Sequence, residues 1–224
     1  MKVIAINGSP RKEWNTAQLL EKSLEGAATL GADTEIINLY DYTFKGCISC
    51  FACHLKKNMD MKVCAYKDEL TPLLKKCLEA DVIIIGTPVY YGFSTGMVRS
   101  LIERLLFPLD TYYVDEKGNR ITKMNRVVPT AMIYTMNANG NQMEKYHIEE
   151  KLSNNENVLK GILGYSEALY SLDTYQFTDY EPYTVNIFDP KHKAEVKKKQ
   201  FPIDLQNAFE LGKRLVNKVH ELNV

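Results

Sequence analysis

The amino-acid sequence predicts an α/β fold in which helices cover both faces of a parallel sheet. Short apolar runs rich in β-branched residues alternate with longer segments of helical period, which is typical of strands joined by crossover helices. The runs at residues 2–6 and 81–86 are almost wholly apolar, as strands buried on both faces are. Because such sheets bind ligands beyond the carboxyl ends of their strands, the loops after the strands are the first place to look for function.

The periodicity places the elements along the chain. Strands are expected at residues 2–6, 34–39, 81–86, 127–134 and 167–175. Helices are expected at residues 16–30, 70–78, 97–106, 142–163 and 204–222. Gly31 is suited to end the first helix and Pro108 to stop the third. Residues 115–125 are polar and indicate a surface loop or small hairpin, and the lysine-rich run 191–199 is interpreted as a solvated face, since like charges repel.

Length and composition limit the classes of protein. The 224 residues suffice for one domain, 1–224, with a cysteine-rich insertion at about 40–68. A net charge of zero gives no reason to expect a nucleic-acid partner. No apolar run has the length of a membrane span and the opening does not resemble a signal peptide, so we expect no membrane partner and a cytoplasmic location. Five cysteines, an odd number, fit a reducing compartment.

The loop at residues 8–16 follows the first strand and leads into the first helix. Ser9, Asn15 and Thr16 are hydrogen-bond donors there, and Arg11 adds a guanidinium. The N-terminus of a helix favours an anion, so this loop indicates a binding site for a terminal phosphate. The alternative is an ordinary turn in which the serine and asparagine merely cap the helix.

Two further loops, 87–96 and 135–140, follow strands at the same edge of the sheet. Both are polar and contain glycine, so one ligand spanning all three loops is the simplest interpretation. Tyr90 and Tyr91 offer flat faces that suit a planar ring system. A phosphate at one end and a large ring at the other indicate FMN; alternatively, these tyrosines cover the end of the sheet or an interface.

The motifs in these loops resemble those of a known family. The stretches are Gly8-Ser-Pro-Arg-Lys-x-x-Asn-Thr16, Gly86-Thr-Pro-Val-Tyr-Tyr-Gly92 and Thr95-Gly-Met-Val-Arg-Ser-Leu-Ile-Glu-Arg104. They look like the NAD(P)H-dependent FMN reductase and iron–sulfur flavoprotein family, over about residues 1–108 and again at 135–137. The resemblance implies a flavodoxin-like fold, whose five parallel strands have the order 2-1-3-4-5.

The resemblance also implies site residues and a reaction. The residues implied for the phosphate are Ser9, Arg11, Asn15 and Thr16. The residues implied for one side of the ring are Pro88, Val89, Tyr90, Tyr91 and Gly92, and those implied for its other side are Thr135, Met136 and Asn137. NAD(P)H would reduce the bound FMN, which would pass electrons to a second acceptor, a small molecule or a protein. The chemistry belongs to the flavin, so no side chain is assigned a catalytic role. His54 and His147 are expected to be surface or capping residues.

Cys47, Cys50, Cys53 and Cys64 form the pattern C-x2-C-x2-C-x10-C. The pattern looks like the cluster motif of the iron–sulfur flavoproteins, although its last gap is longer. Three interpretations stay open: a [4Fe–4S] cluster, metal-free thiols that cycle as a disulfide, and a zinc site that uses His54 as a substitute ligand. Cys77 falls on the apolar face of a predicted helix and is expected in the core.

Aromatic residues crowd the last third of the chain, and those at 179–183 lie in a polar, irregular stretch that suits a subunit interface. The resemblance likewise implies a homodimer or homotetramer. The rival hypotheses are an iron–sulfur flavoprotein, and a flavodoxin-like carrier or sensor without its own NAD(P)H turnover. A dedicated carrier is usually strongly acidic, whereas this chain has no net charge.

Overall fold

The computed structural model describes residues 1–183 and 186–222. Its central sheet has five strands, all paired in parallel, in the order β2-β1-β3-β6-β7. The strands are β1 (Lys2–Asn7), β2 (Asp33–Asn38), β3 (Val82–Pro88), β6 (Val128–Thr135) and β7 (Gly164–Ser171). Counted among themselves, these strands have the order 2-1-3-4-5, which confirms the predicted flavodoxin-like fold.

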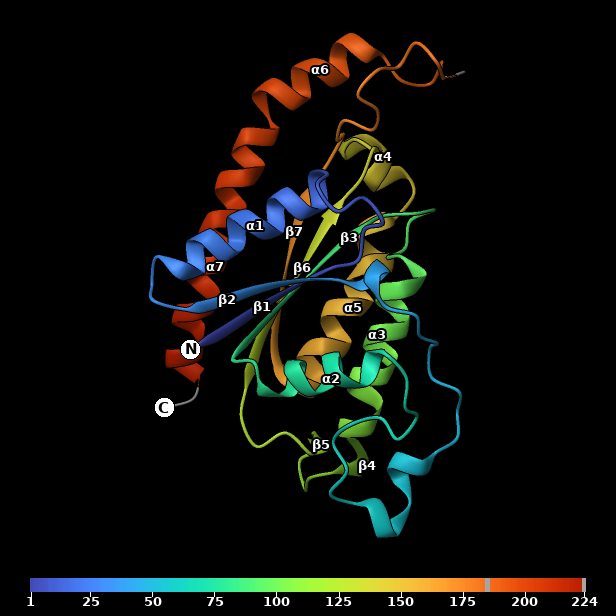
Figure 1. Ribbon diagram of the computed structural model, residues 1–224, viewed down its shortest axis with the longest axis vertical. Coiled ribbons are helices and arrows are strands. Elements are labelled where there is room, and N and C mark those ends of the chain that lie inside the picture. Colours follow the sequence, from blue (N-terminus) through green and yellow to red (C-terminus); the bar gives the residue numbers. More distant parts are fainter. Residues whose placement is uncertain (184–185, 223–224) are drawn as a thin grey trace.

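Helices cover both faces of the sheet (Figure 1). The helices α1 (Asn15–Ala28) and α7 (Phe201–Leu222) lie on one face, and α2 (Leu70–Glu79), α3 (Gly96–Leu106) and α5 (Ile148–Leu163) lie on the other. Successive side chains of β1 therefore enter different cores: Val3 packs toward α1 and α7, and Ile4 toward α2 and α3. None of the helices in the described ranges has the length and apolar character needed to cross a bilayer.

Two glycines allow α1 and α7 to pack backbone against backbone. A Cβ atom on Gly26 would lie 1.9 Å from the Phe209 carbonyl oxygen, and one on Gly212 would lie 1.8 Å from the Ser23 carbonyl oxygen. Both positions require glycine because a larger residue would force the helices apart. This contact brings the last helix of the chain against the helix that follows the first loop.

The predicted elements differ from the observed ones mainly after residue 140. The helix expected at 142–163 is two helices, α4 (Gly140–Lys145) and α5, separated at His147, whose φ is 50°. Gly164, with φ of 96°, ends α5, and β7 begins there rather than at residue 167. Residues 172–175, expected in that strand, lie beyond its end, so they belong to the edge of the sheet where the predicted site lies.

The remaining elements are short. Strands β4 (Asp110–Val114) and β5 (Arg120–Thr122) form an antiparallel hairpin around the predicted surface turn. Within 40–68 the chain forms only single helical turns at Leu39–Asp41, Ala52–His54 and Lys56–Asn58. Another such turn, Phe107–Leu109, follows α3 at the predicted stop. The lysine-rich run forms helix α6 (Pro190–Lys199).

Candidate functional site

The first loop leaves β1 in a fixed path. The Gly8 amide donates to the Gly86 carbonyl at 2.8 Å, and a Cβ atom on Gly8 would lie 2.1 Å from Val98 Cγ2, so only glycine fits. The Asn7 carboxamide then accepts from the Ser9 amide at 3.0 Å, and Ser9 Oγ accepts from the Arg11 amide at 3.1 Å. These short-range bonds shape a turn in front of α1.

Among the described residues, the N-terminus of α1 has no side-chain cap. Its capping position is Trp14, whose side chain makes no capping hydrogen bond. The alternative in which a serine or asparagine of this loop merely caps the helix is therefore wrong. Thr16 Oγ1 instead lies 2.8 Å from Thr135 Oγ1, and this buried contact joins the first loop to the third. The unpaired amides leave the positive end of the helix dipole free to attract an anion.

Thr95 joins the second loop to the first. Its hydroxyl donates to the Gly8 carbonyl at 3.0 Å and accepts from the Val98 amide at 3.4 Å, so it also caps α3. Its amide donates to Thr87 Oγ1 at 3.1 Å. The Val89 amide donates to the Thr135 carbonyl at 2.9 Å, which fixes the second loop against the third.

A tight turn forms the tip of the second loop. Tyr90 and Phe93 exchange backbone hydrogen bonds of 2.9 and 3.0 Å, and Tyr91 and Gly92 between them have φ values of 53° and 85°. Positive φ at both central positions is the geometry of a type I′ turn, which explains the glycine. The Tyr91 side chain is fully exposed, whereas Tyr90 faces the cleft described next.

One cleft gathers the three loops at the carboxyl edge of the sheet. The predicted cofactor residues that line it are Ser9, Arg11, Asn15, Thr16, Pro88, Val89, Tyr90, Thr135, Met136 and Asn137. Tyr91 and Gly92 do not line it. The lining residues that sequence reasoning missed are Trp14, Thr174, Tyr175 and Gln176. Three of these follow β7 and form a fourth loop in the cleft, which the overlong strand expected at 167–175 had hidden.

The first loop holds the segment that follows β7. Arg11 Nη1 donates to the Gln176 carbonyl at 2.6 Å, and Asn15 Nδ2 donates to the Tyr175 carbonyl at 2.9 Å. Trp14 Nε1 donates to that same Tyr175 carbonyl at 3.2 Å. The side chains predicted to bind phosphate thus also define one wall of the cleft.

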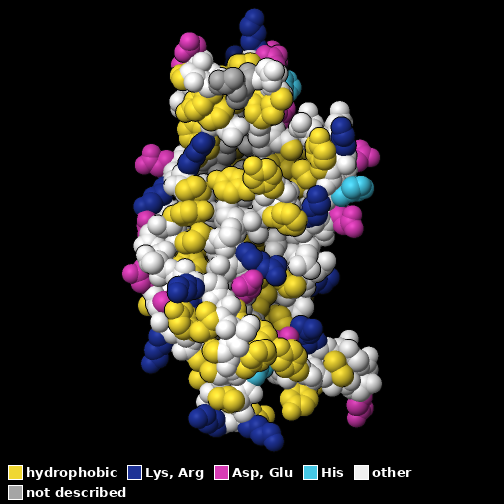
Figure 2. All heavy atoms as spheres, turned by 90° about the vertical axis from the view of Figure 1, so that its right-hand side faces the viewer, with side chains coloured by type: hydrophobic (Ala, Val, Ile, Leu, Met, Phe, Trp, Pro, Cys, Tyr) yellow, Lys and Arg dark blue, Asp and Glu magenta, His cyan; other side chains and the backbone are white. Residues whose placement is uncertain are grey.

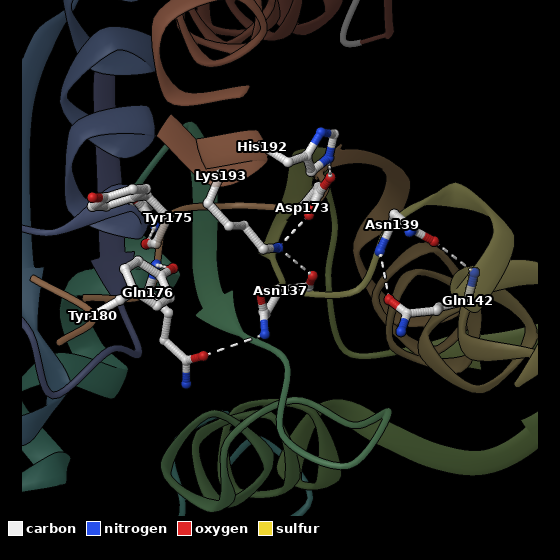
Figure 3. Close-up of polar contacts among 10 residues, drawn as sticks. Asn137, Asn139, Gln142, Asp173, Tyr175, Gln176, Tyr180, His192 and Lys193 are labelled. Atoms are coloured by element: carbon white, nitrogen blue, oxygen red, sulfur yellow. Dashed lines mark hydrogen bonds and ion pairs between the residues drawn. The ribbon is translucent and has the colours of Figure 1, made fainter. Parts of the chain in front are cut away.

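Asn137 projects into the cleft from the third loop. Its Nδ2 atom donates to Gln176 Oε1 at 3.3 Å (Figure 3). Its Oδ1 atom is buried and has no hydrogen-bond partner among the described residues. A buried acceptor without a donor is costly, so this atom is a candidate acceptor for a ligand N–H group.

Lys193 supports the third loop from helix α6. The interpretation of the lysine-rich run as a solvated face is wrong at this position, because the Lys193 side chain is 3% exposed and ion-paired with Asp173. Its Nζ atom also donates to the Asn137 carbonyl at 2.9 Å (Figure 3). No periodicity in the sequence separates this lysine from its exposed neighbours.

The four clustered cysteines line a second, smaller cavity at the C-terminal end of α3. Cys53 is buried, Cys47 and Cys64 are half-buried and Cys50 is exposed, and all four are free thiols. Burial raises the pKa of Cys53, nearby Cys64 and Cys50 raise it further, and Lys123 lowers it. In the described part of the chain no three His, Cys, Asp or Glu side chains are arranged around a single metal position. Cys77 is buried in the core, as predicted.

Arg104 fastens this segment to α3. Its guanidinium is fully buried, pairs with Asp68 and donates to the carbonyls of Lys45 at 3.1 Å and Tyr66 at 2.5 Å. Burial alone would lower the pKa of Arg104, but Asp68 and Cys64 raise it, so the charge is retained. His54 Nε2 donates to the Phe107 carbonyl at 3.0 Å, and its imidazole packs on the Phe107 ring, so the His54 side chain is engaged in packing.

Known proteins resemble this chain in sequence and in fold. An iron-sulfur flavoprotein of Archaeoglobus fulgidus is 49% identical over 104 residues, which are 46% of this chain and 48% of that protein. An iron-sulfur flavoprotein of Methanocaldococcus jannaschii is 40% identical over 104 residues, 46% of this chain and 51% of that protein. The match thus spans about half the length of these curated relatives.

Solved structures share the fold. An azoreductase from Bacillus anthracis superposes with a TM-score of 0.65 at 12% identity, over 96% of this chain and 99% of that one. An NAD(P)H:quinone oxidoreductase from Methanothermobacter marburgensis superposes with a TM-score of 0.63 at 14% identity, over 96% of each chain. The sequence model of the family described as NADPH-dependent FMN reductase matches residues 1–161, which hold all three predicted loops. The chain therefore belongs to the NADPH-dependent FMN reductase family.

Proposed function

We propose that this chain is an FMN-binding oxidoreductase that takes electrons from NAD(P)H and passes them to a second acceptor. The observation that carries the proposal is the convergence, in one cleft, of an uncapped helix N-terminus, hydroxyl and guanidinium donors, and two loops that face each other. These are the parts needed for a ligand with a phosphate at one end and a ring at the other.

The residues present suit the phosphate end of FMN. Ser9 and Thr16 are buried hydroxyls in the first loop, and Asn15 and Arg11 contribute N–H donors beside them. An anion here would complete the first turn of α1 and pair with the Arg11 guanidinium. Phosphate would share these donors with the Tyr175 and Gln176 carbonyls, which already accept from them.

The residues present also suit the ring end. Pro88, Val89 and Tyr90 would lie along one side of a flavin, and Met136 and Asn137 along the other. The unpaired Asn137 Oδ1 atom is an acceptor for an N–H group on the rim of the ring. When bound, the flavin supplies the hydride and electron chemistry. The chain orients the ring, excludes water from it and holds its rim.

The assignment of Tyr91 and Gly92 to the loop that lines the flavin ring stays a prediction. Gly92 is needed for the turn that presents Tyr90, and this is a backbone role. The exposed Tyr91 ring is available to a nicotinamide, an acceptor or a second subunit.

Titration with FMN and a turnover assay test the proposal. We expect the purified protein to quench FMN fluorescence saturably and to oxidise NADH or NADPH anaerobically when a quinone, an azo dye or ferricyanide is added. Binding without turnover with any of these acceptors would favour the flavodoxin-like carrier or sensor. A chain that binds no FMN would contradict the proposal.

We also propose that the four clustered cysteines hold a [4Fe–4S] cluster. Support comes from the cavity that all four thiols line and from the names of the curated relatives. Anaerobically purified protein should contain about four irons and four sulfides per chain, and Cys47→Ala should lose them while Cys77→Ala keeps them. About one zinc per chain would establish the zinc alternative, and neither metal would leave redox-active thiols.

The assembly is proposed to be a homodimer or homotetramer of one-domain subunits in the reducing cytoplasm. The face that carries α3 shows many hydrophobic side chains (Figure 2). Large hydrophobic side chains that are exposed in the structure include Tyr91 and Phe93 in the second loop and Ile48 and Phe51 beside the cysteines. Such a surface suits a subunit contact. Sedimentation equilibrium of the purified chain measures the oligomeric state, and a monomer at micromolar concentration would contradict the proposed homodimer or homotetramer.

A further inference from the structure

Lys193 is a buried cation whose role the family match does not cover, since that match ends at residue 161. It is the buried residue of helix α6, and the neighbouring Lys191, Lys197 and Lys198 are exposed. Its Nζ atom also lies 5.3 Å from the centre of the Phe188 ring. Burying a lysine is costly unless its charge is paired, so the contacts that it makes at this position are strong constraints on its neighbours.

Those contacts hold the third loop of the cleft. Nζ donates to the Asn137 carbonyl at 2.9 Å and pairs with Asp173. The Asp173 amide in turn donates to the Ala138 carbonyl at 2.9 Å, and its other carboxylate oxygen lies 2.6 Å from His192 Nε2. Figure 3 shows Lys193 reaching between Asp173 and Asn137, with Asn137 turned toward Gln176.

The backbone at Asp173 indicates that this arrangement is enforced. Its φ is 56°, in the left-handed region that few residues other than glycine adopt. The next residue, Thr174, donates from its amide to the Met136 carbonyl at 2.9 Å. Residues 136–138 are thus hydrogen-bonded to the segment after β7, and Lys193 contacts both.

We infer that Lys193 is a positioning residue for the cofactor ring, acting through Asn137. Lys193 fixes the backbone of Asn137 and thereby sets the direction of the Asn137 side chain. The Oδ1 atom of that side chain is buried at the cleft and has no hydrogen-bond partner among the described residues. The ligand that it serves is a planar heterocycle with an N–H group on its rim. This inference rests on the proposed FMN function, and it assigns α6 a part in recognising the ring.

The experiment compares FMN affinity in four proteins by fluorescence quenching: wild type, Lys193→Met, Asn137→Ala and the double variant. Lys193→Met should weaken binding by up to about tenfold, the loss expected when the one hydrogen bond from the ring to Asn137 is no longer held in place. Because Lys193 acts through Asn137, the double variant should bind about as well as Asn137→Ala alone rather than showing the product of both losses. Lys198→Met, on the exposed side of the same helix, is the matched control and should bind like wild type.

A second measurement separates positioning from stability. At saturating FMN, the visible circular dichroism of the bound ring should change in Lys193→Met and stay unchanged in Lys198→Met. If Lys193→Met does not fold, its combination with Asp173→Asn removes both charges and is tested in the same way. Unchanged FMN affinity and dichroism in Lys193→Met would overturn the inference while the FMN proposal stands. Independent losses of affinity in the Lys193→Met and Asn137→Ala variants would do the same. A wild-type protein that binds no FMN would overturn both.

Discussion

Individual side chains on β6 point into two different environments. Thr135 meets Thr16 at the cleft, whereas the preceding Tyr134 enters the core under α5. The Tyr134 hydroxyl donates to Glu156 Oε1 at 2.6 Å and accepts from Asn155 Nδ2 at 3.1 Å. Burial raises the pKa of Glu156 above its usual range, although the Tyr134 hydrogen bond opposes the shift. Folding therefore favours the neutral acid.

Replacing Glu156 with glutamine should change how stability depends on pH. Because the folded-state pKa of Glu156 is raised, its favourable contribution to the free energy of unfolding is fully present below the unfolded pKa of about 4.3. That contribution is lost as pH rises through the folded pKa. Glutamine keeps an acceptor for Tyr134 but cannot ionise. Relative to wild type, Glu156→Gln should gain unfolding free energy in urea titrations as pH rises from the unfolded pKa through the raised folded pKa. The exposed Glu144→Gln should show no such trend, and a relative loss with rising pH would contradict the assignment.

Arg11 is the charged side chain of the predicted phosphate end. Arg11→Ala should weaken FMN binding by about 1.5–3 kcal/mol, since a charge-assisted hydrogen bond to phosphate is lost. Isothermal titration measures the change. The control is Lys12→Ala, because Lys12 pairs with Asp41 and does not line the cleft. Equal affinities for the Arg11 and Lys12 variants would remove Arg11 from the site.

At the scale of elements, the closest packing joins α1 to α7. This contact anchors the helix whose N-terminus faces the cleft, because the Gly26 and Gly212 backbones lie against the opposite helix. Local sequence patterns predict both helices but not their mutual approach. Glycines inside helices by themselves suggest positions where the helix is less stable, and the structure shows that the close packing of α1 and α7 requires them.

Alanine substitution of two helical glycines should have opposite effects. Gly26→Ala should destabilise the protein by about 1–3 kcal/mol, because the new methyl group would overlap the Phe209 carbonyl. Gly161→Ala, in α5, should stabilise by about 0.5–1 kcal/mol, because alanine favours a helix and its Cβ atom would lie more than 4 Å from every described atom outside the adjacent residues and the nearby backbone of α5. Urea unfolding of both variants gives the comparison. A neutral Gly26→Ala would show that the two helices can separate without cost.

At the scale of the whole molecule, one buried arginine anchors both ends of the long segment at 40–68. Arg104 binds the Lys45 and Tyr66 carbonyls and pairs with Asp68, so it holds both ends of the cysteine loop against α3. This explains how a stretch with only single helical turns keeps a defined path. The four cysteines are brought together by that anchor as well as by their spacing.

Arg104→Met should release the cysteine segment. We expect a loss of about 3–5 kcal/mol, because Asp68 would lose its buried partner, and faster reaction of the buried Cys53 thiol with a thiol reagent in metal-free protein. Arg99→Met, which breaks an exposed pair with Glu103, should cost less than about 1 kcal/mol. Slow Cys53 reaction in a folded Arg104→Met variant would show that the loop holds itself.

Much of the cleft follows from local sequence. Ser9 and Tyr90 lie in loops just after buried strands, Pro88 ends one of those strands and Thr16 lies in the first turn of the following helix. A strand followed by a polar loop and a helix is a short-range signal. The residues missed by sequence reasoning depend on distant contacts. Arg11 and Gln176 are 165 positions apart, and the strand expected through residue 175 concealed the loop to which Gln176 belongs.

The sequence by itself determined the parallel α/β fold, the strand order implied by the family motifs and the three loops that line the cleft, because apolar periodicity and turn residues act over a few positions. Only the tertiary structure decided that Tyr91 faces solvent while Tyr90 lines the cleft, and that Lys193 alone of the lysines in α6 is buried. The physical reason is that burial of a side chain depends on which distant surface packs over it. A lysine has the same local pattern whether its charge meets water or a carboxylate from another loop.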